Sequence, residues 1–224
     1  MDAALFDWDG TLVDSLGPLY RANLAVMHSF GLAYDEATYR STYQPDWRRM
    51  YGRLGIPAER LDEADELWHA AYDGGSTSAL FPGTAEALDR LARSGLRLGL
   101  VTAGERSVVA PQLARLGLAG LFAVEVFGDD HPTHKPDPAP LRAALAALGL
   151  ADRPAAATYL GDFTDDMRMA RQAGTRAVGV ASALADPAEL LAAGAHEVVP
   201  SVAEWADRAM GIMLVDRLPH APAV

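Results

Sequence analysis

Two aspartates, Asp7 and Asp9, lie two residues apart where a short apolar run ends, and this spacing suits chemistry on a small group. The apolar residues 3–6 are typical of a buried strand. In extended backbone, residues two apart point to the same side, separated by roughly 7 Å. One acid can then attack a group held between them while the other exchanges a proton with the leaving atom. Gly10 permits the sharp turn that follows, and Thr11 can hold that turn with a local hydrogen bond.

The same residues also fit a plain structural turn, and an aspartate beside a glycine occurs in calcium-binding loops as well. The spacing excludes the calcium loop. If Asp9 and Gly10 filled its fifth and sixth positions, Leu5 and Leu16 would fill the first and the twelfth, where such a loop requires acids. The plain turn stays open when these residues are considered alone, so the rest of the chain must decide.

Further polar residues lie at the carboxyl ends of other runs that we expect to be strands. They are Thr102 after residues 98–101, Lys135 in the loop after residues 124–127, and Asp162, Asp165 and Asp166 after residues 159–161. Taken singly, each has a structural explanation: a threonine can cap a helix, acids can complement a helix dipole, and a lysine can lie in a solvated loop. Ligands of open α/β sheets, however, bind at the carboxyl edge of the strands. Because these side chains share that edge with Asp7 and Asp9, we predict a common site there.

The composition is that of a globular protein with an excess of acid. The chain has 224 residues, 50% of them hydrophobic and 22% charged, and a formal net charge of −11. This charge argues against nucleic acid or an anionic membrane as partner, whereas a phosphorylated substrate is compatible if a divalent cation masks the carboxylates. No cysteine is present, which excludes thiol catalysis and thiolate metal sites. Lys135 is the one lysine among 19 Lys and Arg residues, as expected at a site that needs a compact point charge.

Neither a targeting segment nor a membrane segment is visible in the sequence. The N-terminus lacks a basic stretch followed by a long apolar run, and no apolar segment is long enough to span a bilayer. We therefore expect a soluble, cytoplasmic protein without a membrane partner. The sequence does not indicate the oligomeric state.

Residues 16–80 have helical patterns and no convincing strand. Helices are expected over residues 18–30, 47–54 and 59–72, followed by a flexible link at residues 74–78. From residue 84 onward helices and strands alternate, and glycines end several of the helices. The strands are expected at residues 96–102, 122–127, 157–161, 176–181 and 197–199.

This alternation predicts an α/β fold with a doubly wound, Rossmann-like parallel sheet that helices cover on both faces. A small α-helical cap is inserted after strand 1. We expect a core domain of residues 1–15 and 81–215, a helical cap of residues 16–80, and a flexible tail of residues 216–224.

The order of these motifs resembles the haloacid dehalogenase (HAD) superfamily of hydrolases, in particular its phosphoglycolate phosphatase-like branch with a helical cap of the C1 type. The matching segments agree in type and order and run along nearly the whole chain: residues 7–15, 81–83, 135–138 and 161–166. The four segments together indicate this superfamily far more specifically than any one of them does alone.

The resemblance implies a role for each acid of the predicted site. Asp7 would be the nucleophile that accepts the phosphoryl group as an aspartyl-phosphate, and Asp9 would protonate the leaving oxygen and then deprotonate the hydrolytic water. Mg²⁺ would be the cofactor, held by Asp7, the backbone carbonyl of Asp9 and Asp162, with Asp166 as a direct or indirect partner. These roles agree with the chemistry, because phosphoryl transfer depends mostly on positioning and charge stabilisation and because magnesium prefers oxygen ligands.

The resemblance also assigns the groups that bind the transferring oxygens, namely Thr102, the backbone N–H of Ala103 and Lys135. Relatives often carry an asparagine where this chain has Ala103. The backbone donor is retained there, but a side-chain contact that helps to orient the substrate is lost.

Four further polar residues have less specific interpretations. Arg48 and Arg49 of the cap either reach a second anionic group on the substrate or lie on a solvated helix face. His131 and His134 flank the lysine loop without a carboxylate or thiol at ligand spacing, so we interpret them as loop residues.

The expected function is a Mg²⁺-dependent phosphatase, similar to phosphoglycolate phosphatases, that hydrolyses a small phosphorylated metabolite. A dehalogenase would need neither Asp9 nor Asp162, and a phosphonoacetaldehyde-type hydrolase needs a cap lysine that this chain lacks. A phosphosugar mutase shares the whole core set and stays the enzymatic alternative. A non-catalytic binding module is the alternative from another class, although no core carboxylate is lost.

Overall fold

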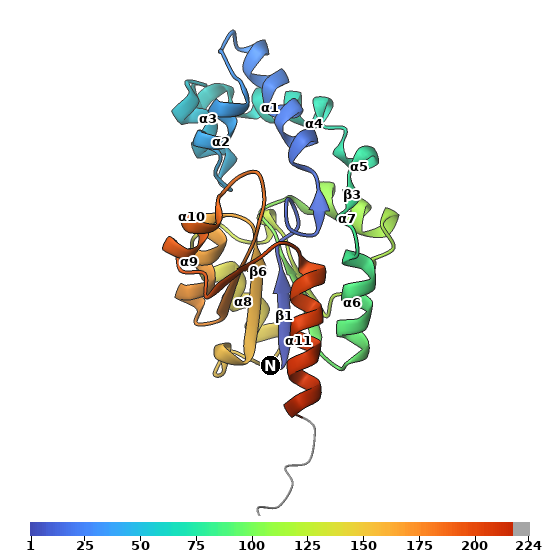
Figure 1. The fold of residues 1–224 in the computed structure, drawn as a ribbon. Helices are drawn as coiled ribbons and strands as arrows, with labels where there is room; N and C mark the ends of the chain where they lie inside the picture. Colours follow the sequence, from blue (N-terminus) through green and yellow to red (C-terminus); the bar gives the residue numbers. More distant parts are fainter. Residues whose placement is uncertain (217–224) are drawn as a thin grey trace, which may run out of the picture.

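The computed structural model describes residues 1–216 and centres on a sheet of six parallel strands (Figure 1). Their order is β5-β4-β1-β6-β7-β8. The strands are β1 (Ala3–Phe6), β4 (Arg97–Val101), β5 (Val124–Val126), β6 (Ala157–Gly161), β7 (Arg176–Val180) and β8 (Glu197–Val199). Phe6 of the central β1 pairs with Leu100 of β4 on one side and with Leu160 of β6 on the other. The predicted doubly wound parallel sheet is confirmed.

Helices cover both faces of the sheet and enclose two apolar cores (Figure 1). One face carries α6 (Thr84–Arg93), α7 (Arg106–Arg115) and α11 (Val202–Asp216), and the other carries α8 (Ala139–Ala147), α9 (Thr164–Ala173) and α10 (Pro187–Ala192). The short 3-10 turns η2 (Gly128–Asp130) and η3 (Pro154–Ala156) lie in connecting loops. In β1, Ala4 and Phe6 enter one core and Ala3 and Leu5 the other, because successive strand residues point to opposite faces.

Residues 16–80, the expected helical cap, lie beyond the carboxyl edge of the sheet (Figure 1). They form α1 (Leu16–Ser29), α2 (Glu36–Thr42), α3 (Trp47–Leu54), η1 (Ala58–Arg60), α4 (Leu61–Ala71) and α5 (Gly74–Thr77). These helices share a third apolar cluster, which includes Val26 and Tyr51 and which Leu184 of the core joins. The start of α3 is fixed by Asp46, whose side chain accepts a hydrogen bond from the backbone N–H of Arg49 at 3.1 Å.

The two chain crossings between core and cap pair with each other. The strands β2 (Val13–Asp14) and β3 (Ala79–Leu80) form a two-stranded antiparallel ribbon. Next to it, the backbone N–H of Phe81 donates to the carbonyl of Leu12 at 3.0 Å. The expected elements do not include this ribbon, because strands of two residues carry no periodic pattern.

Three further details differ from the sequence-based expectations. Helix α2 is absent from the expected elements, because it is short and buries only Tyr39. The segment 74–78, expected as a flexible link, contains the helical turn α5. Asp216 ends helix α11 instead of opening a tail, and the rest of the expected tail, residues 217–224, lies outside the described residues. Within residues 1–216, no helix has both the length and the apolar character that crossing a membrane requires.

Candidate active site

The register of the strands places Asp7 at the centre of the carboxyl edge of the sheet. Asp7 directly follows β1, and its backbone N–H donates to the carbonyl of Leu160 at 2.8 Å. Thr102 directly follows β4, and its backbone N–H donates to the carbonyl of Val126 at 3.0 Å. Asp162 directly follows β6. The three side chains therefore start from adjacent strand ends.

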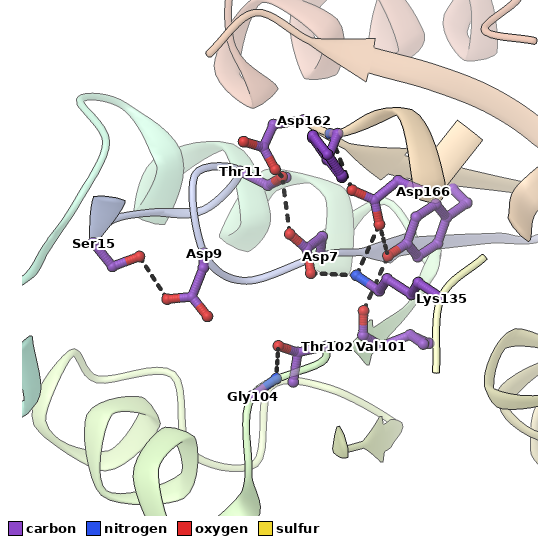
Figure 2. A network of polar contacts seen from close by, with 12 residues as sticks. Asp7, Asp9, Thr11, Ser15, Val101, Thr102, Gly104, Lys135, Asp162 and Asp166 are labelled. Atoms are coloured by element: carbon purple, nitrogen blue, oxygen red, sulfur yellow. Dashed lines mark hydrogen bonds and ion pairs between the residues drawn. The ribbon is translucent and has the colours of Figure 1, made fainter. Parts of the chain in front are cut away.

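Lys135 lies buried between two carboxylates (Figure 2). Its Nζ lies 2.5 Å from Asp7 Oδ1 and 2.8 Å from Asp166 Oδ1. The side chains of all three residues are at most 9% exposed. Water therefore screens this ion pair little, and the lysine fixes both acids in place.

Asp162 completes a group of three buried acids, and one of its oxygens is unpaired. Its Oδ1 accepts a hydrogen bond from Thr11 Oγ1 at 3.3 Å, and the same hydroxyl lies 3.5 Å from Asp7 Oδ2 (Figure 2). Within the described residues, the buried Oδ2 of Asp162 has no hydrogen-bond partner. Gly10 has a φ of 75°, and a Cβ there would lie 2.3 Å from this oxygen. The turn after β1 is therefore shaped around the unpaired oxygen.

Both oxygens of Asp166 have partners. Its Oδ1 contacts Lys135 and lies 3.0 Å from the hydroxyl of Tyr159, and its Oδ2 accepts a hydrogen bond from the backbone N–H of Phe163 at 3.1 Å. A Cβ at Gly161 would lie 2.4 Å from the carboxyl carbon of Asp166, so this approach needs a glycine. Sequence reasoning did not single out Tyr159, because a tyrosine inside a buried strand is typical of a core residue.

Asp9 lies on the other side of Asp7 from Lys135 (Figure 2). From the sequence, we expected an extended backbone to point the side chains of Asp7 and Asp9 to the same side. Strand β1 ends at Phe6, however, and Asp9 lies in the turn that follows. The Oδ1 of Asp9 accepts a hydrogen bond from Ser15 Oγ at 2.5 Å. Ser15 belongs to the motif of residues 7–15, but no spacing rule indicated this contact.

Thr102 and Ala103 line a cavity of about 20 Å³ beside Asp7. That volume corresponds to roughly one or two water molecules. The buried Oγ1 of Thr102 accepts a hydrogen bond from the backbone N–H of Gly104 at 3.0 Å. Glu105 is the N-cap residue of α7, so helix capping does not explain Thr102.

Burial shifts the ionisation of the site. It raises the pKa of Asp7 to about 7, although the charge of Lys135 partly offsets the effect. Burial also raises the pKa of Asp9, and it raises that of Asp162 further because Asp7 and Asp166 add negative charge. Burial alone would lower the pKa of Lys135, but attraction to Asp166 and Asp7 outweighs it and raises the pKa. A bound cation would therefore displace protons from these carboxyl groups.

Asp7, Asp162 and Asp166 fit a hard divalent cation. One oxygen from each lies within 4.8 Å of the others, and all three residues are buried. Asp162 offers an unpaired oxygen, whereas both oxygens of Asp166 are engaged, so Asp162 is better suited as a direct ligand. The neighbouring Asp165 lies outside the group, because its Oδ1 pairs with Arg168 Nη1 at 2.7 Å.

The two cap arginines of the sequence-based hypothesis have different surroundings. Arg48 pairs with Asp62 at 3.2 Å, and its guanidinium lies 4.5 Å from the ring centroid of Trp47. Arg49 instead lines a cavity of about 430 Å³, which His134 also lines. Of the two, Arg49 therefore faces a space where a ligand fits.

Cap residues between α2 and α3 cover the site. Tyr43 and Pro45 line the small cavity beside Asp7. The ring of Tyr43 packs edge-on against Phe163, with centroids 5.1 Å apart. The Nε2 of Gln44 is buried and has no hydrogen-bond partner among the described residues. This segment carries no motif, so only the tertiary structure reveals its place.

Known proteins share both this sequence pattern and this fold. The family model of haloacid dehalogenase-like hydrolases matches residues 4–180. The phosphoglycolate phosphatase of Chromobacterium violaceum is 31% identical over 215 residues, which cover 92% of this chain and 95% of the relative. The crystal structure of a hydrolase from Pseudomonas syringae has a TM-score of 0.85 and 25% identity, covering 95% of this chain and 99% of the other. A proposed beta-phosphoglucomutase from Thermotoga maritima has a TM-score of 0.73 and 27% identity, covering 95% and 100%. The chain therefore belongs to the haloacid dehalogenase-like hydrolase family.

Proposed function

We propose that this chain is a Mg²⁺-dependent phosphatase that hydrolyses a small phosphorylated metabolite through an aspartyl-phosphate on Asp7. The observation that carries the proposal is the buried carboxylate of Asp7, which lies against Lys135 and borders a small cavity shared with Asp9. A carboxylate nucleophile divides one difficult step into two easier ones. The phosphoglycolate phosphatases among the relatives support a phosphomonoester as the substrate class.

In the first step, a carboxylate oxygen of Asp7 forms a bond to phosphorus while the bond from phosphorus to the ester oxygen breaks. Asp9 donates its proton to that ester oxygen, which leaves as an alcohol. Burial raises the pKa of Asp9, which favours this acid role near neutral pH. Lys135, the backbone N–H of Ala103 and the hydroxyl of Thr102 would bind the transferring oxygens.

In the second step, a water molecule attacks the phosphorus of the aspartyl-phosphate. Asp9, now ionised, accepts a proton from that water, the bond between phosphorus and Asp7 breaks, and inorganic phosphate leaves. The carboxylate of Asp7 and the proton on Asp9 are both restored. The hydrogen bond from Ser15 would hold the Asp9 carboxyl group in place for both proton transfers.

Asp7, Asp162 and the backbone carbonyl of Asp9 would hold Mg²⁺, and Asp166 would act by positioning Lys135. The unpaired oxygen of Asp162 supports this assignment. When bound, Mg²⁺ supplies positive charge that offsets the carboxylates against an anionic substrate and stabilises charge on the transferring group.

Residues 16–80 would act as a cap domain over a core domain of residues 1–15 and 81–215. The apolar cluster that the cap helices share supports this division, because Leu184 is its one buried member from outside residues 16–80 among the described residues. Such a cap would exclude bulk water during the first step and would contact the leaving group, so substrate choice would depend on its side chains.

The direct test is phosphate release from a panel of small phosphomonoesters, measured with Mg²⁺ and with a chelator. We expect release by the wild type with Mg²⁺ and a loss of roughly 10³-fold or more in Asp7→Asn. Asp14→Asn is the matched control, because Asp14 is exposed on the nearby strand β2 and should keep activity. Equal release by Asp7→Asn and the wild type would refute the nucleophile.

Hydrolysis in ¹⁸O-labelled water tests the order of bond changes. Because water attacks phosphorus in the second step, the label should appear in inorganic phosphate and not in the side chain of Asp7. Label found in Asp7 after repeated turnover would mean attack on the carboxyl carbon, which contradicts the proposed second step.

A phosphosugar mutase is the second candidate, and the likeness to the proposed beta-phosphoglucomutase of Thermotoga maritima favours it. Such an enzyme returns the phosphoryl group to the sugar instead of to water. A phosphosugar incubated with a trace of its bisphosphate distinguishes the two: free phosphate without isomer supports the phosphatase, and isomer with little free phosphate supports the mutase. Neither product in any assay would support a non-catalytic binding module.

A further inference from the structure

A cavity of about 110 Å³ lies between cap and core next to Asp9. It shares the lining residues Asp9, Tyr43, Pro45 and Ala103 with the small cavity beside Asp7. An alcohol that leaves phosphorus at Asp7 and takes the proton of Asp9 can therefore extend into this space, which we call the leaving-group cavity. Its volume holds several water molecules, and hence a small organic group.

Aromatic rings from the cap form much of its wall. Trp47 and Tyr51 of α3 have ring centroids 5.5 Å apart, and Trp68 of α4 stacks on Tyr72 at 4.6 Å. All four line the leaving-group cavity. The guanidinium of Arg48 packs against the ring of Trp47, 4.5 Å from its centroid, so this ring already makes one cation–π contact. Ring faces of this kind attract ammonium groups.

The charged side chains that line the leaving-group cavity are acids. Asp65 and Glu105 line it together with Asp9, and none of the described Arg, Lys and His residues does. His69 lies just behind, with Nε2 3.4 Å from Glu105 Oε2 and 3.7 Å from Asp65 Oδ1. A positive charge on His69 would neutralise only one of the two negative charges of Asp65 and Glu105. A second anionic group on the substrate would therefore face like charge here.

The larger cavity of about 430 Å³ has the opposite charge. Arg49, Arg53, Arg168 and Lys135 line it together with two acids, Asp46 and Asp165, so positive charge is in excess, and Asp9 does not line it. An anion bound there would have complementary charge but no contact with the proposed proton donor. The leaving-group cavity is therefore lined by negative charge and the larger cavity mainly by positive charge.

We propose that the leaving group of the substrate is a small amino alcohol, with a protonated or quaternary nitrogen on an apolar frame. This inference rests on the proposed phosphatase function and narrows its substrate class. The nitrogen faces the rings of Trp47 and Trp68 and the carboxylates of Asp65 and Glu105, while the ester oxygen reaches Asp9. Substrates with a second anionic group, such as phosphoglycolate, are disfavoured.

The test compares kcat/KM for three phosphomonoesters at saturating Mg²⁺. Phosphocholine carries the positive charge, 3,3-dimethylbutyl phosphate has the same shape without it, and phosphoglycolate carries a carboxylate. We expect phosphocholine to be preferred over its neutral isostere by roughly three- to thirtyfold, which is the range of cation–π attraction. Phosphoglycolate should be the poorest substrate.

Choline is also the better leaving group in water, which by itself favours phosphocholine. The decisive quantity is therefore the ratio of kcat/KM for phosphocholine to kcat/KM for the neutral isostere, and how this ratio changes between variants. Glu105→Gln and Trp47→Leu should both lower this ratio, and Trp47→Phe should retain most of it. Glu66→Gln is the matched control, because Glu66 is exposed on α4 outside the leaving-group cavity. Thermal unfolding of each variant checks that the fold is intact.

Binding of choline alone, followed by tryptophan fluorescence, gives a readout that does not depend on turnover. Choline should bind more tightly than glycolate, and the substitution Glu105→Gln should weaken the binding of choline. A preference for phosphoglycolate, or a ratio that Glu105→Gln leaves unchanged, would overturn this inference and leave the phosphatase proposal intact. No phosphate release from any ester would contradict the phosphatase proposal, and choline binding would then decide the charge preference of the cavity by itself.

Discussion

Asp162 is a buried carboxylate whose Oδ2 lacks a partner and whose neighbours Asp7 and Asp166 are also acids. Burial and this like charge raise the pKa of Asp162 well above its usual range, so this side chain destabilises the metal-free fold at neutral pH, because the fold must bind a proton that the unfolded chain releases or else hold a buried, unpaired charge. One pKa unit corresponds to about 1.4 kcal/mol. We therefore expect Asp162→Asn to raise the free energy of unfolding by about 1 kcal/mol or more in the presence of a chelator, measured by denaturant titration.

With Mg²⁺ present, we expect the wild type to be more stable than Asp162→Asn, the reverse of their order in a chelator. A ligand at 100 times its Kd stabilises the fold by about 2.7 kcal/mol, so the wild type should gain stability with Mg²⁺ and Asp162→Asn should gain little. Asp165→Asn is the control, because Asp165 pairs with the half-exposed Arg168 and lies outside the acid group. A metal-free Asp162→Asn that is less stable than the wild type would contradict this account.

Affinity for Mg²⁺ should depend on pH, because the acids that would bind it hold protons more tightly in the fold than in water. The pKa of Asp7 is raised to about 7 and that of Asp162 is raised as well. Below about pH 7 a proton must leave before the cation binds, so affinity should fall as pH decreases from 8 to 6, by up to about tenfold per proton and pH unit. Calorimetry in buffers of different ionisation enthalpy measures both the affinity and the protons released. Affinity that is constant over this range would contradict the raised pKa values.

At the scale of elements, the turn after β1 depends on Gly10. Its φ of 75° is costly for other residues, and a Cβ there would lie 2.3 Å from Asp162 Oδ2. We expect Gly10→Ala to lower the free energy of unfolding by roughly 2 kcal/mol or more and to weaken Mg²⁺ binding. Gly52→Ala is the matched control: Gly52 lies inside α3 with open space around it, so the change should stabilise by about 0.5–1 kcal/mol. Equal effects of the two substitutions would refute the role of Gly10.

Elements with a clear periodic pattern could be predicted from the sequence. The bounds of α3, β6 and β8 agree with expectation, because apolar runs and helix-ending residues define them locally. Helix α2 and the β2–β3 ribbon could not be predicted, since both are short and depend on tertiary contacts.

The same division applies to the candidate site. The rule that ligands bind at the carboxyl edge of a parallel sheet was enough to predict that Asp7, Lys135 and Asp162 would lie together. It could not predict the partners Ser15 and Tyr159, because these contacts depend on how the turn after β1 bends and on which side chains of β6 face Asp166.

At the scale of the whole molecule, the net charge of −11 affects how an anionic substrate arrives. Like charge slows the encounter, and salt screens this repulsion. With saturating Mg²⁺, kcat/KM for a dianionic ester such as 3,3-dimethylbutyl phosphate should therefore rise when NaCl is increased from 20 to 200 mM, by roughly two- to threefold. The zwitterionic head of phosphocholine lowers its net charge, so its salt dependence should be weaker. A fall in kcat/KM with salt for the dianion would mean that local positive charge dominates the approach.

The ribbon of β2 and β3 has a mechanical consequence. Two unpaired linkers would let the helical cap move in several directions, whereas we expect crossings that pair with each other to move as one hinge. Ser15, the first residue beyond β2, holds the carboxyl group of Asp9. A rotation about this hinge would also move Ser15, so we expect the angle of the cap to affect the orientation of the Asp9 carboxyl group.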